Sequence, residues 1–173
     1  MTRPDQENSG LGDILFRLSQ DLVRRDPGSL ARLRRMPPDG PGDGVFWDLA
    51  TRHGLRTDEA GMRLVRMLAL LTPKGAPDQH KVLHKGKRTL GVVLVGTGYP
   101  ESRLLRLLAM PFAARGEALE GAVRWIAAKG HDGVNTLDLA LLIFSADVKH
   151  SRRLAQDYYA EHYRQSAKKD DAA

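Results

Sequence analysis

The sequence predicts an all-α protein, a two-lobed helical bundle of about eight or nine helices. Leucine and isoleucine recur three and four residues apart along most of the chain, which is the spacing of one face of a helix. Capping residues and prolines stand where such segments begin, as in Asp26-Pro27. The chain has 173 residues, 42% of them hydrophobic, and is therefore long enough to bury a core without disulfides.

The first half of the chain is expected to form helices joined by short loops. The strongest begins after the capping residue Thr57 and ends near Leu71, and its surface is apolar except around Arg63 and Arg66. A helix of that kind belongs at the centre of a core. The expected helices in this half are residues 11–25, 27–35, 45–52 and 58–71.

The second half begins with a long basic connection, residues 72–88. The next segment, residues 89–95, is too short and too rich in β-branched residues for its periodicity to distinguish a helix from a strand. Proline, glycine and asparagine mark the ends of the segments that follow. The expected helices there are residues 101–110, 117–129, 137–144 and 151–162.

The chain divides into two predicted lobes and a tail. The N-terminal lobe, which includes the basic connection, covers residues 1–95, and the C-terminal lobe covers residues 96–165. Residues 166–173 are mostly polar and are expected to be disordered. No stretch approaches the roughly 18 apolar residues of a membrane span, and the first residues are polar. We therefore expect a cytoplasmic protein that does not bind a membrane.

Positive charge is concentrated in the middle of the sequence. The chain carries 27 basic and 21 acidic residues, a formal net charge of +6. Residues 61–110 hold nine basic and two acidic side chains, whereas the two flanks are nearly balanced. Segregated positive charge is typical of proteins that bind a nucleic-acid backbone, because each neutralised phosphate releases condensed counterions. The same charge also fits a solvated surface.

Catalytic and metal-binding patterns are weak. The absence of cysteine excludes disulfides, thiolate nucleophiles and cysteine-ligated metals. His80 and His84 are four residues apart, but no glutamate follows the first and the segment reads as a loop. The dipeptide His131-Asp132 occurs in metal-dependent phosphohydrolases, yet here it lies in a glycine-bounded turn without further evident ligands. We therefore expect no catalytic activity, no metal ion and no other cofactor.

What remains is the placement of basic residues on helices. Arginines three residues apart lie on one helical face, away from the leucines of the same segment. Such faces suit a sugar-phosphate backbone, which carries no sequence information. The candidate nucleic-acid-binding residues are Arg34, Arg35, Lys85, Lys87, Arg88, Arg103, Arg106, Arg152 and Arg153.

Four groups of motifs, in their order and spacing, carry a family resemblance. They are residues 30–35 (LARLRR) with 46–49 (FWDL), 67–71 (MLALL) leading into 89–91 (TLG), 101–108 (ESRLLRLL), and 154–159 (LAQDYY). With these motifs the chain resembles the CasB family, the small subunit of the type I-E CRISPR surveillance complex Cascade. Of the candidate residues, Arg34, Arg35, Arg103 and Arg106 lie inside the motifs, and the others are chosen on charge alone.

The resemblance implies an all-helical, two-lobed, non-enzymatic subunit that pairs with a second copy of itself. It implies contacts with the large subunit and with the backbone subunits that hold the CRISPR RNA (crRNA), in a complex that serves antiviral defence. Its basic surfaces are expected to hold crRNA and the backbones of the target and non-target DNA strands, which stabilises the R-loop. It also favours a helix for residues 89–95.

Two alternatives stay open at this point. One is a small helical metal-dependent phosphohydrolase built on His131 and Asp132. The other is a structural adaptor whose basic surface meets an acidic protein partner.

Overall fold

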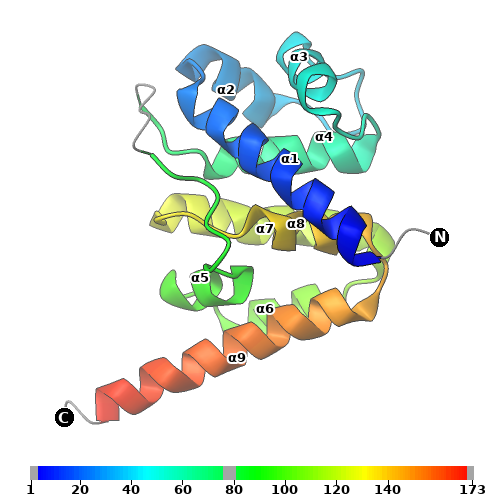
Figure 1. The fold of residues 1–173 in the computed structure, drawn as a ribbon. Coiled ribbons are helices and arrows are strands. Elements are labelled where there is room, and N and C mark those ends of the chain that lie inside the picture. Colours follow the sequence, from blue (N-terminus) through cyan, green and yellow to red (C-terminus); the bar gives the residue numbers. More distant parts are fainter. Residues whose placement is uncertain (1–3, 76–80, 171–173) are drawn as a thin grey trace.

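Nine helices make up most of the part of the chain that the structure describes. The structure is a computed structural model, and it describes residues 4–75 and 81–170. Within those ranges it contains helices and one isolated β-bridge but no strand, so the predicted all-α class is confirmed. The helices are α1 (Pro4–Arg24), α2 (Pro27–Arg35), α3 (Gly44–His53), α4 (Glu59–Leu71), α5 (Leu90–Gly96), α6 (Glu101–Ala109), α7 (Phe112–Lys129), α8 (Thr136–Phe144) and α9 (Val148–Asp170) (Figure 1).

The helices are stacked along one direction of the molecule (Figure 1). Helices α2 and α3 lie at one end beside α4, whereas α5, α6 and α9 lie at the other end. Helices α7 and α8 lie between them, and α1 crosses this middle region and contacts α3, α4 and α8. Helix α9 is 23 residues long, and its C-terminal end extends beyond the other helices. No helix in residues 4–75 or 81–170 is long and apolar enough to cross a membrane.

A continuous hydrophobic core runs through this stack. It contains residues from both sides of the predicted lobe boundary, such as Leu68 of α4 and Ile126 of α7, which are both fully buried. Helix α4 packs against α2, α7 and α8, and most of its side chains are buried. Its predicted central position is therefore confirmed.

Arg63 and Arg66 of α4 turn towards the protein and not towards solvent. Both reach Glu120 of α7, at N–O distances of 3.4 and 3.2 Å, and Arg124 reaches the same carboxylate at 2.8 Å. The Glu120 side chain is only 10% exposed. We call these four residues the Glu120 cluster. It joins the two central helices by surrounding one buried carboxylate with guanidinium groups.

Residues 90–96 form helix α5, as the family resemblance implies. Its buried residues Leu90, Val93 and Leu94 follow helical spacing, and its most extensive packing partner is α9. The two helices approach closely at Gly91, where an added Cβ would lie 2.5 Å from the backbone nitrogen of Tyr158. The contact that fixes the conformation of α5 is thus made with a helix far along the chain.

Replacing Gly91 with alanine is expected to lower the free energy of unfolding by about 1–3 kcal/mol, because α5 and α9 must move apart. The change should be visible as a lower urea midpoint. Gly96→Ala is the matched control, because nothing lies within 4 Å of a Cβ added at Gly96. Equal midpoints for the two variants would contradict the close approach of these helices.

Some helix ends differ from the predicted ones for local reasons. Asp58, and not Thr57, caps α4: its Oδ1 accepts a hydrogen bond from the N–H of Gly61 at 2.9 Å. Pro111, expected to end a helix, also directly precedes α7, where its missing N–H is not needed. Helix α9 includes residues 166–170 of the expected tail, and residues 171–173 lie outside the described residues.

Candidate nucleic-acid interface

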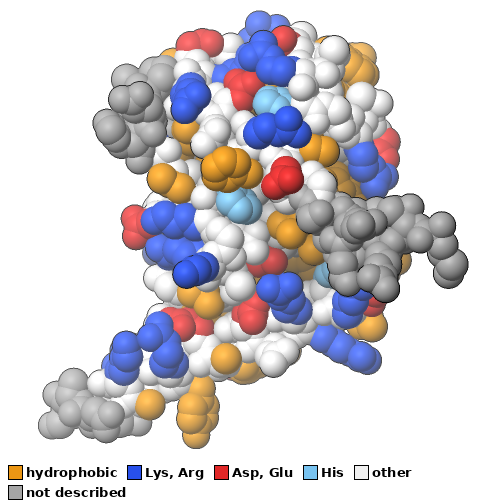
Figure 2. Space-filling view, viewed as in Figure 1, with side chains coloured by type: hydrophobic (Ala, Val, Ile, Leu, Met, Phe, Trp, Pro, Cys, Tyr) orange, Lys and Arg blue, Asp and Glu red, His pale blue; other side chains and the backbone are white. Residues whose placement is uncertain are grey.

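A tight turn just before α5 presents basic side chains. The N–H of Arg88 donates to the carbonyl of Lys85 at 3.0 Å, which closes a β-turn over residues 85–88. Lys85 and Lys87 are exposed, and neither forms an ion pair with a described residue. We call residues 85–88 the basic turn. On the face in Figure 2, Lys and Arg side chains gather at the left edge, beside the segment that leads into α5.

The basic turn is fixed to the segment that precedes α8. The N–H of Lys85 donates to the carbonyl of Val134 at 2.9 Å, and the N–H of Asn135 donates to the carbonyl of Arg88 at 2.7 Å. The side-chain amide of Asn135 donates to the carbonyl of Gly86 at 3.1 Å, while its Oδ1 caps α8. Because Asn135 is buried and uses both ends of its amide, it holds the turn and α8 in one arrangement.

Gly133 and Asp132 shape the side chains of the turn. Gly133 has a φ of +106°, and a Cβ there would lie 2.9 Å from Cγ of Lys85, so the lysine stem lies directly against the glycine. Asp132 pairs with Arg88 at 3.3 Å, but its side chain is 84% exposed and the pair is weak. The turn therefore keeps most of its positive charge.

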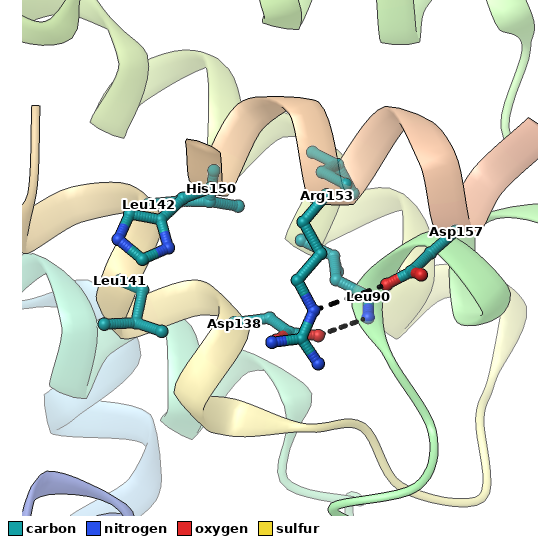
Figure 3. A pocket seen from close by; sticks show the side chains of 8 residues that line it. Leu90, Asp138, Leu141, Leu142, His150, Arg153 and Asp157 are labelled. Carbon is teal, nitrogen blue, oxygen red and sulfur yellow. Dashed lines mark hydrogen bonds and ion pairs between the residues drawn. The ribbon is translucent and has the colours of Figure 1, made fainter. Parts of the chain in front are cut away.

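Arg153 lies beside the start of α5 (Figure 3). Its side chain and Leu90 line a small pocket together with Asp138 and Asp157. The Nε atom of Arg153 is 4.0 Å from the Asp157 carboxylate, and Asp138 accepts a hydrogen bond from the N–H of Leu90 at 2.9 Å. These two carboxylates weaken the positive potential around Arg153, although its side chain, like that of its neighbour Arg152, is exposed.

The Asp138→Asn variant is expected to be more stable than the native protein at about pH 7, with the difference shrinking towards about pH 3. Burial raises the pKa of Asp138, although the N–H of Leu90 and the charge of Arg153 oppose the rise. A raised pKa means that ionisation costs stability as the pH climbs from the ordinary carboxyl pKa through the raised one. Asparagine removes that cost and keeps an oxygen for Leu90. Urea denaturation at both pH values measures the difference.

Asp147→Asn is a control of opposite sign for this experiment. Hydrogen bonds from the backbone N–H and the side chain of Lys149 lower the pKa of Asp147. Its ionised form therefore stabilises the fold above the ordinary carboxyl pKa, and that contribution is lost as the pH falls through the lowered pKa. If Asp138→Asn showed the same pH profile as the native protein, burial of the Asp138 charge would carry no cost.

Arg103 and Arg106 lie on the exposed face of α6, and Trp125 of α7 supports the first of them. The guanidinium carbon of Arg103 is 5.0 Å from the centre of the Trp125 ring, and Nζ of Lys129 is 5.2 Å from it. The indole N–H donates to the carbonyl of Thr97 at 3.1 Å, so the ring itself is fixed. Arg103 is thus held in position, and Arg106 has no comparable support.

Arg34 and Arg35 are neighbours with different environments. Arg34 donates to the carbonyl of Ala69 from Nε and to that of Thr72 from Nη2, both at 2.8 Å. It thereby satisfies carbonyls that the C-terminus of α4 leaves unpaired. Burial lowers the pKa of Arg34. Arg35 is exposed at the end of α2 and is the member of the pair that presents its charge to solvent.

His131 also forms a hydrogen bond with the C-terminal end of α4. Its Nε2–H donates to the carbonyl of Leu71 at 2.8 Å, and its Nδ1 accepts the N–H of Gly133 at 3.0 Å. Both ring nitrogens are engaged, so His131 offers no lone pair to a metal ion in this conformation. The geometry therefore gives His131, on which the phosphohydrolase alternative was built, a structural role at the end of α4.

The other histidine pattern includes His84, whose ring is hydrogen-bonded inside the protein. His84 forms a 2.7 Å hydrogen bond through Nδ1 with Oγ1 of Thr136, and its partner in the pattern, His80, lies outside the described residues. Among residues 4–75 and 81–170, no three metal-ligating side chains gather in a group that could hold an ion.

The structure brings only some of the nine predicted residues together. The basic turn and Arg153 both adjoin the N-terminus of α5. Arg35 lies on α2, at the opposite end of the stack from α9 (Figure 1). The α6 arginines lie on another helix, which contacts α7 and α9. The candidate interface is therefore defined best at the basic turn.

Two residues that shape this turn, Asn135 and Gly133, are missing from the predicted site. The sequence indicates Asn135 as the cap of α8, and the structure confirms that role. Its second role depends on the carbonyl of Gly86, which is 49 residues away in the chain. An asparagine that caps a helix through its side-chain oxygen still has an NH2 group that can donate a hydrogen bond. This free donor was the only sequence signal of the second role.

The fold and its exposed charges define an all-α protein that carries basic side chains on a rigid turn. Comparisons with protein-family models, with curated proteins and with solved structures give no match for this chain.

Proposed function

We propose that this protein is a non-catalytic nucleic-acid-binding subunit of a CRISPR RNA-guided surveillance complex, similar to the CasB small subunit. The observation that carries the proposal is the basic turn. Lys85 and Lys87 have no ion-pair partner among the described residues, and hydrogen bonds link the backbone of the turn, at Lys85, Gly86 and Arg88, to Val134 and Asn135. Cations on a preorganised support bind phosphates with little additional loss of conformational entropy.

The role that suits such a surface is stabilisation of an R-loop. Exchange of a DNA duplex for an RNA–DNA heteroduplex is nearly balanced in free energy, and protein contacts to the backbones shift that balance. In this proposal the turn and the exposed arginines of α6 and α9 contact target DNA, non-target DNA or crRNA without reading their sequence.

The proposed setting is the cytoplasm, in antiviral defence, with no cofactor and no membrane. The partners are the large subunit, the crRNA-backbone subunits and a second copy of this chain. These partners follow from the family resemblance.

Binding of single-stranded DNA at several salt concentrations tests the proposal. The logarithm of the association constant should fall with the logarithm of salt concentration, with a slope of roughly −0.7 for each phosphate contacted. Unrelated base sequences should bind with similar affinity. Polyglutamate serves as a control: if it competes as well as DNA does, the adaptor alternative is favoured. Turnover of a phosphodiester with stoichiometric bound metal would contradict the non-catalytic role.

A further inference from the structure

A second feature adjoins the basic turn. A pocket of about 160 Å³ lies between α1 and residues 81–84, the segment that leads into the turn. Its lining includes Phe16, Ser19, Gln20 and Arg24 of α1, with Val82 and His84 on the opposite side. A cavity of about 150 Å³ accommodates a benzene ring, so the pocket has the size of a single-ring heterocycle.

Ser19, one of the lining residues, carries a buried hydroxyl without a partner in the part of the chain that the structure describes. The residue is 2% exposed, and its hydroxyl has no hydrogen-bond partner among the described residues. Serine and threonine in helices commonly donate to the carbonyl four residues earlier, as Thr72 does at 2.8 Å and Ser166 at 3.1 Å. Ser19 forms no such bond. A buried hydroxyl without a partner is rare in native proteins, because it has lost water without a replacement.

The other walls suit a planar, partly polar ring. Phe16 is 48% exposed although it is a large apolar side chain, and its ring lies 6.0 Å from that of His84 at an angle of 85°. Nucleobases stack on such exposed aromatic rings whatever their identity. The amide of Gln20 offers both a donor and an acceptor to a base edge. Burial lowers the pKa of His84, which favours its neutral form.

The position of the pocket connects it with a nucleic-acid strand. His84 forms part of its wall, and Lys85, the first residue of the basic turn, follows directly in the chain. Arg24, at another part of the lining, is exposed and has no ion pair with a described residue. Positive charge therefore lies on both sides of an opening of nucleobase size.

We propose that this pocket receives one unstacked pyrimidine base of the single strand whose phosphates contact the basic turn. The inference rests on the proposed function and adds a contact that a backbone-only interface lacks. The base stacks against Phe16, and rotation of the Ser19 side chain about χ1 brings its unpaired hydroxyl, which solvent does not reach in the present conformation, to a polar atom on the base edge. Because either a carbonyl or an amino group can bond a hydroxyl, thymine and cytosine are both accepted.

Fluorescence anisotropy with two labelled strands tests this inference. The strands are oligothymidylate of about twelve nucleotides and an abasic strand with the same sugar-phosphate backbone. The native protein should bind oligothymidylate about 5- to 140-fold more tightly than the abasic strand. Phe16→Ala should bring this ratio close to one. Phe112→Ala, at a similarly exposed phenylalanine on α7, should leave the ratio unchanged.

Ser19→Ala separates a ligand role from a structural one. Removing an unpaired buried hydroxyl should leave thermal stability unchanged or slightly higher. The same variant should lower the ratio of the two affinities, because the base loses its partner. A loss of stability with an unchanged ratio would overturn the inference.

The two proposals fail in different ways. Equal binding of both strands by the native protein would overturn the base pocket and leave backbone binding intact. Absence of binding to either strand would overturn the proposed function, and the pocket inference with it.

Discussion

Neutralising Lys85 and Lys87 together, as K85Q/K87Q, is expected to weaken single-stranded DNA binding by about 25-fold at 0.1 M salt. Two lost phosphate contacts reduce the magnitude of the log–log salt slope by about 1.4. Over the tenfold range from 1 M to 0.1 M salt, this smaller slope corresponds to a loss of affinity of about 25-fold. Both side chains are exposed, so the fold should be unaffected. A salt titration of the association constant for the variant and the native protein measures both quantities.

A matched control for that variant is available on α9. Lys168 and Lys169 are exposed near the end of the helix, and K168Q/K169Q removes the same net charge. Because charges are screened beyond about 10 Å at 0.1 M salt, this control should change affinity only slightly. Equal losses for the two double variants would mean that net charge, and not the turn, drives binding. The corresponding variant, R103Q/R106Q, then shows whether the two arginines of α6 contribute more or less to DNA affinity than the two lysines of the basic turn.

Glu120→Gln is expected to lower the free energy of unfolding by about 3 kcal/mol, because three arginines lose their shared carboxylate. Glutamine keeps the shape of the side chain, so the loss reports charge and not packing. Arg63 and Arg66 are 18% and 19% exposed in their side chains, and water therefore replaces the missing partner poorly. Urea denaturation of the variant and the native protein measures the difference.

Glu59→Gln is the matched control for the Glu120 cluster. Glu59 pairs with Arg63 at 2.9 Å, but its own side chain is 59% exposed. An exposed pair of this kind contributes about 0–1 kcal/mol. If Glu120→Gln also lowered the free energy of unfolding by less than about 1 kcal/mol, solvent would screen the Glu120 cluster. That result would contradict the expectation drawn from the burial of its carboxylate.

The parts of the fold that the sequence predicts are those determined locally. Asp26 and Asn135 each accept a backbone N–H two or three residues ahead, so their capping roles are contained in a few neighbouring residues. Helix α5 is different, because seven residues with valine and leucine satisfy either periodicity. Its conformation is fixed by packing at Gly91 against α9, and no local pattern contains that contact.

The candidate site was predictable in charge but not in geometry. Counting basic residues places Lys85 and Lys87 in the most positive segment, and the structure shows both exposed. The same counting gives Arg34 and Arg35 equal weight, although Arg34 binds the carbonyls of α4. Whether an arginine faces solvent depends on which backbone groups the fold brings near it. Ser19 shows the same limit, because its unpaired hydroxyl becomes evident only with its surroundings.

The C-terminal end of α4 has a consequence for how the molecule opens. His131, from the predicted C-terminal lobe, bonds the carbonyl of Leu71 at that end, whereas α4 and its other partner Arg34 belong to the predicted N-terminal lobe. Separating the lobes would leave the carbonyl of Leu71 without its donor, so partial opening is penalised. The two lobes should therefore behave as one cooperative unit. In native-state hydrogen exchange, the slowest amides of α2 and α8 should exchange with the same free energy and the same denaturant dependence, whereas separate values would indicate lobes that unfold independently.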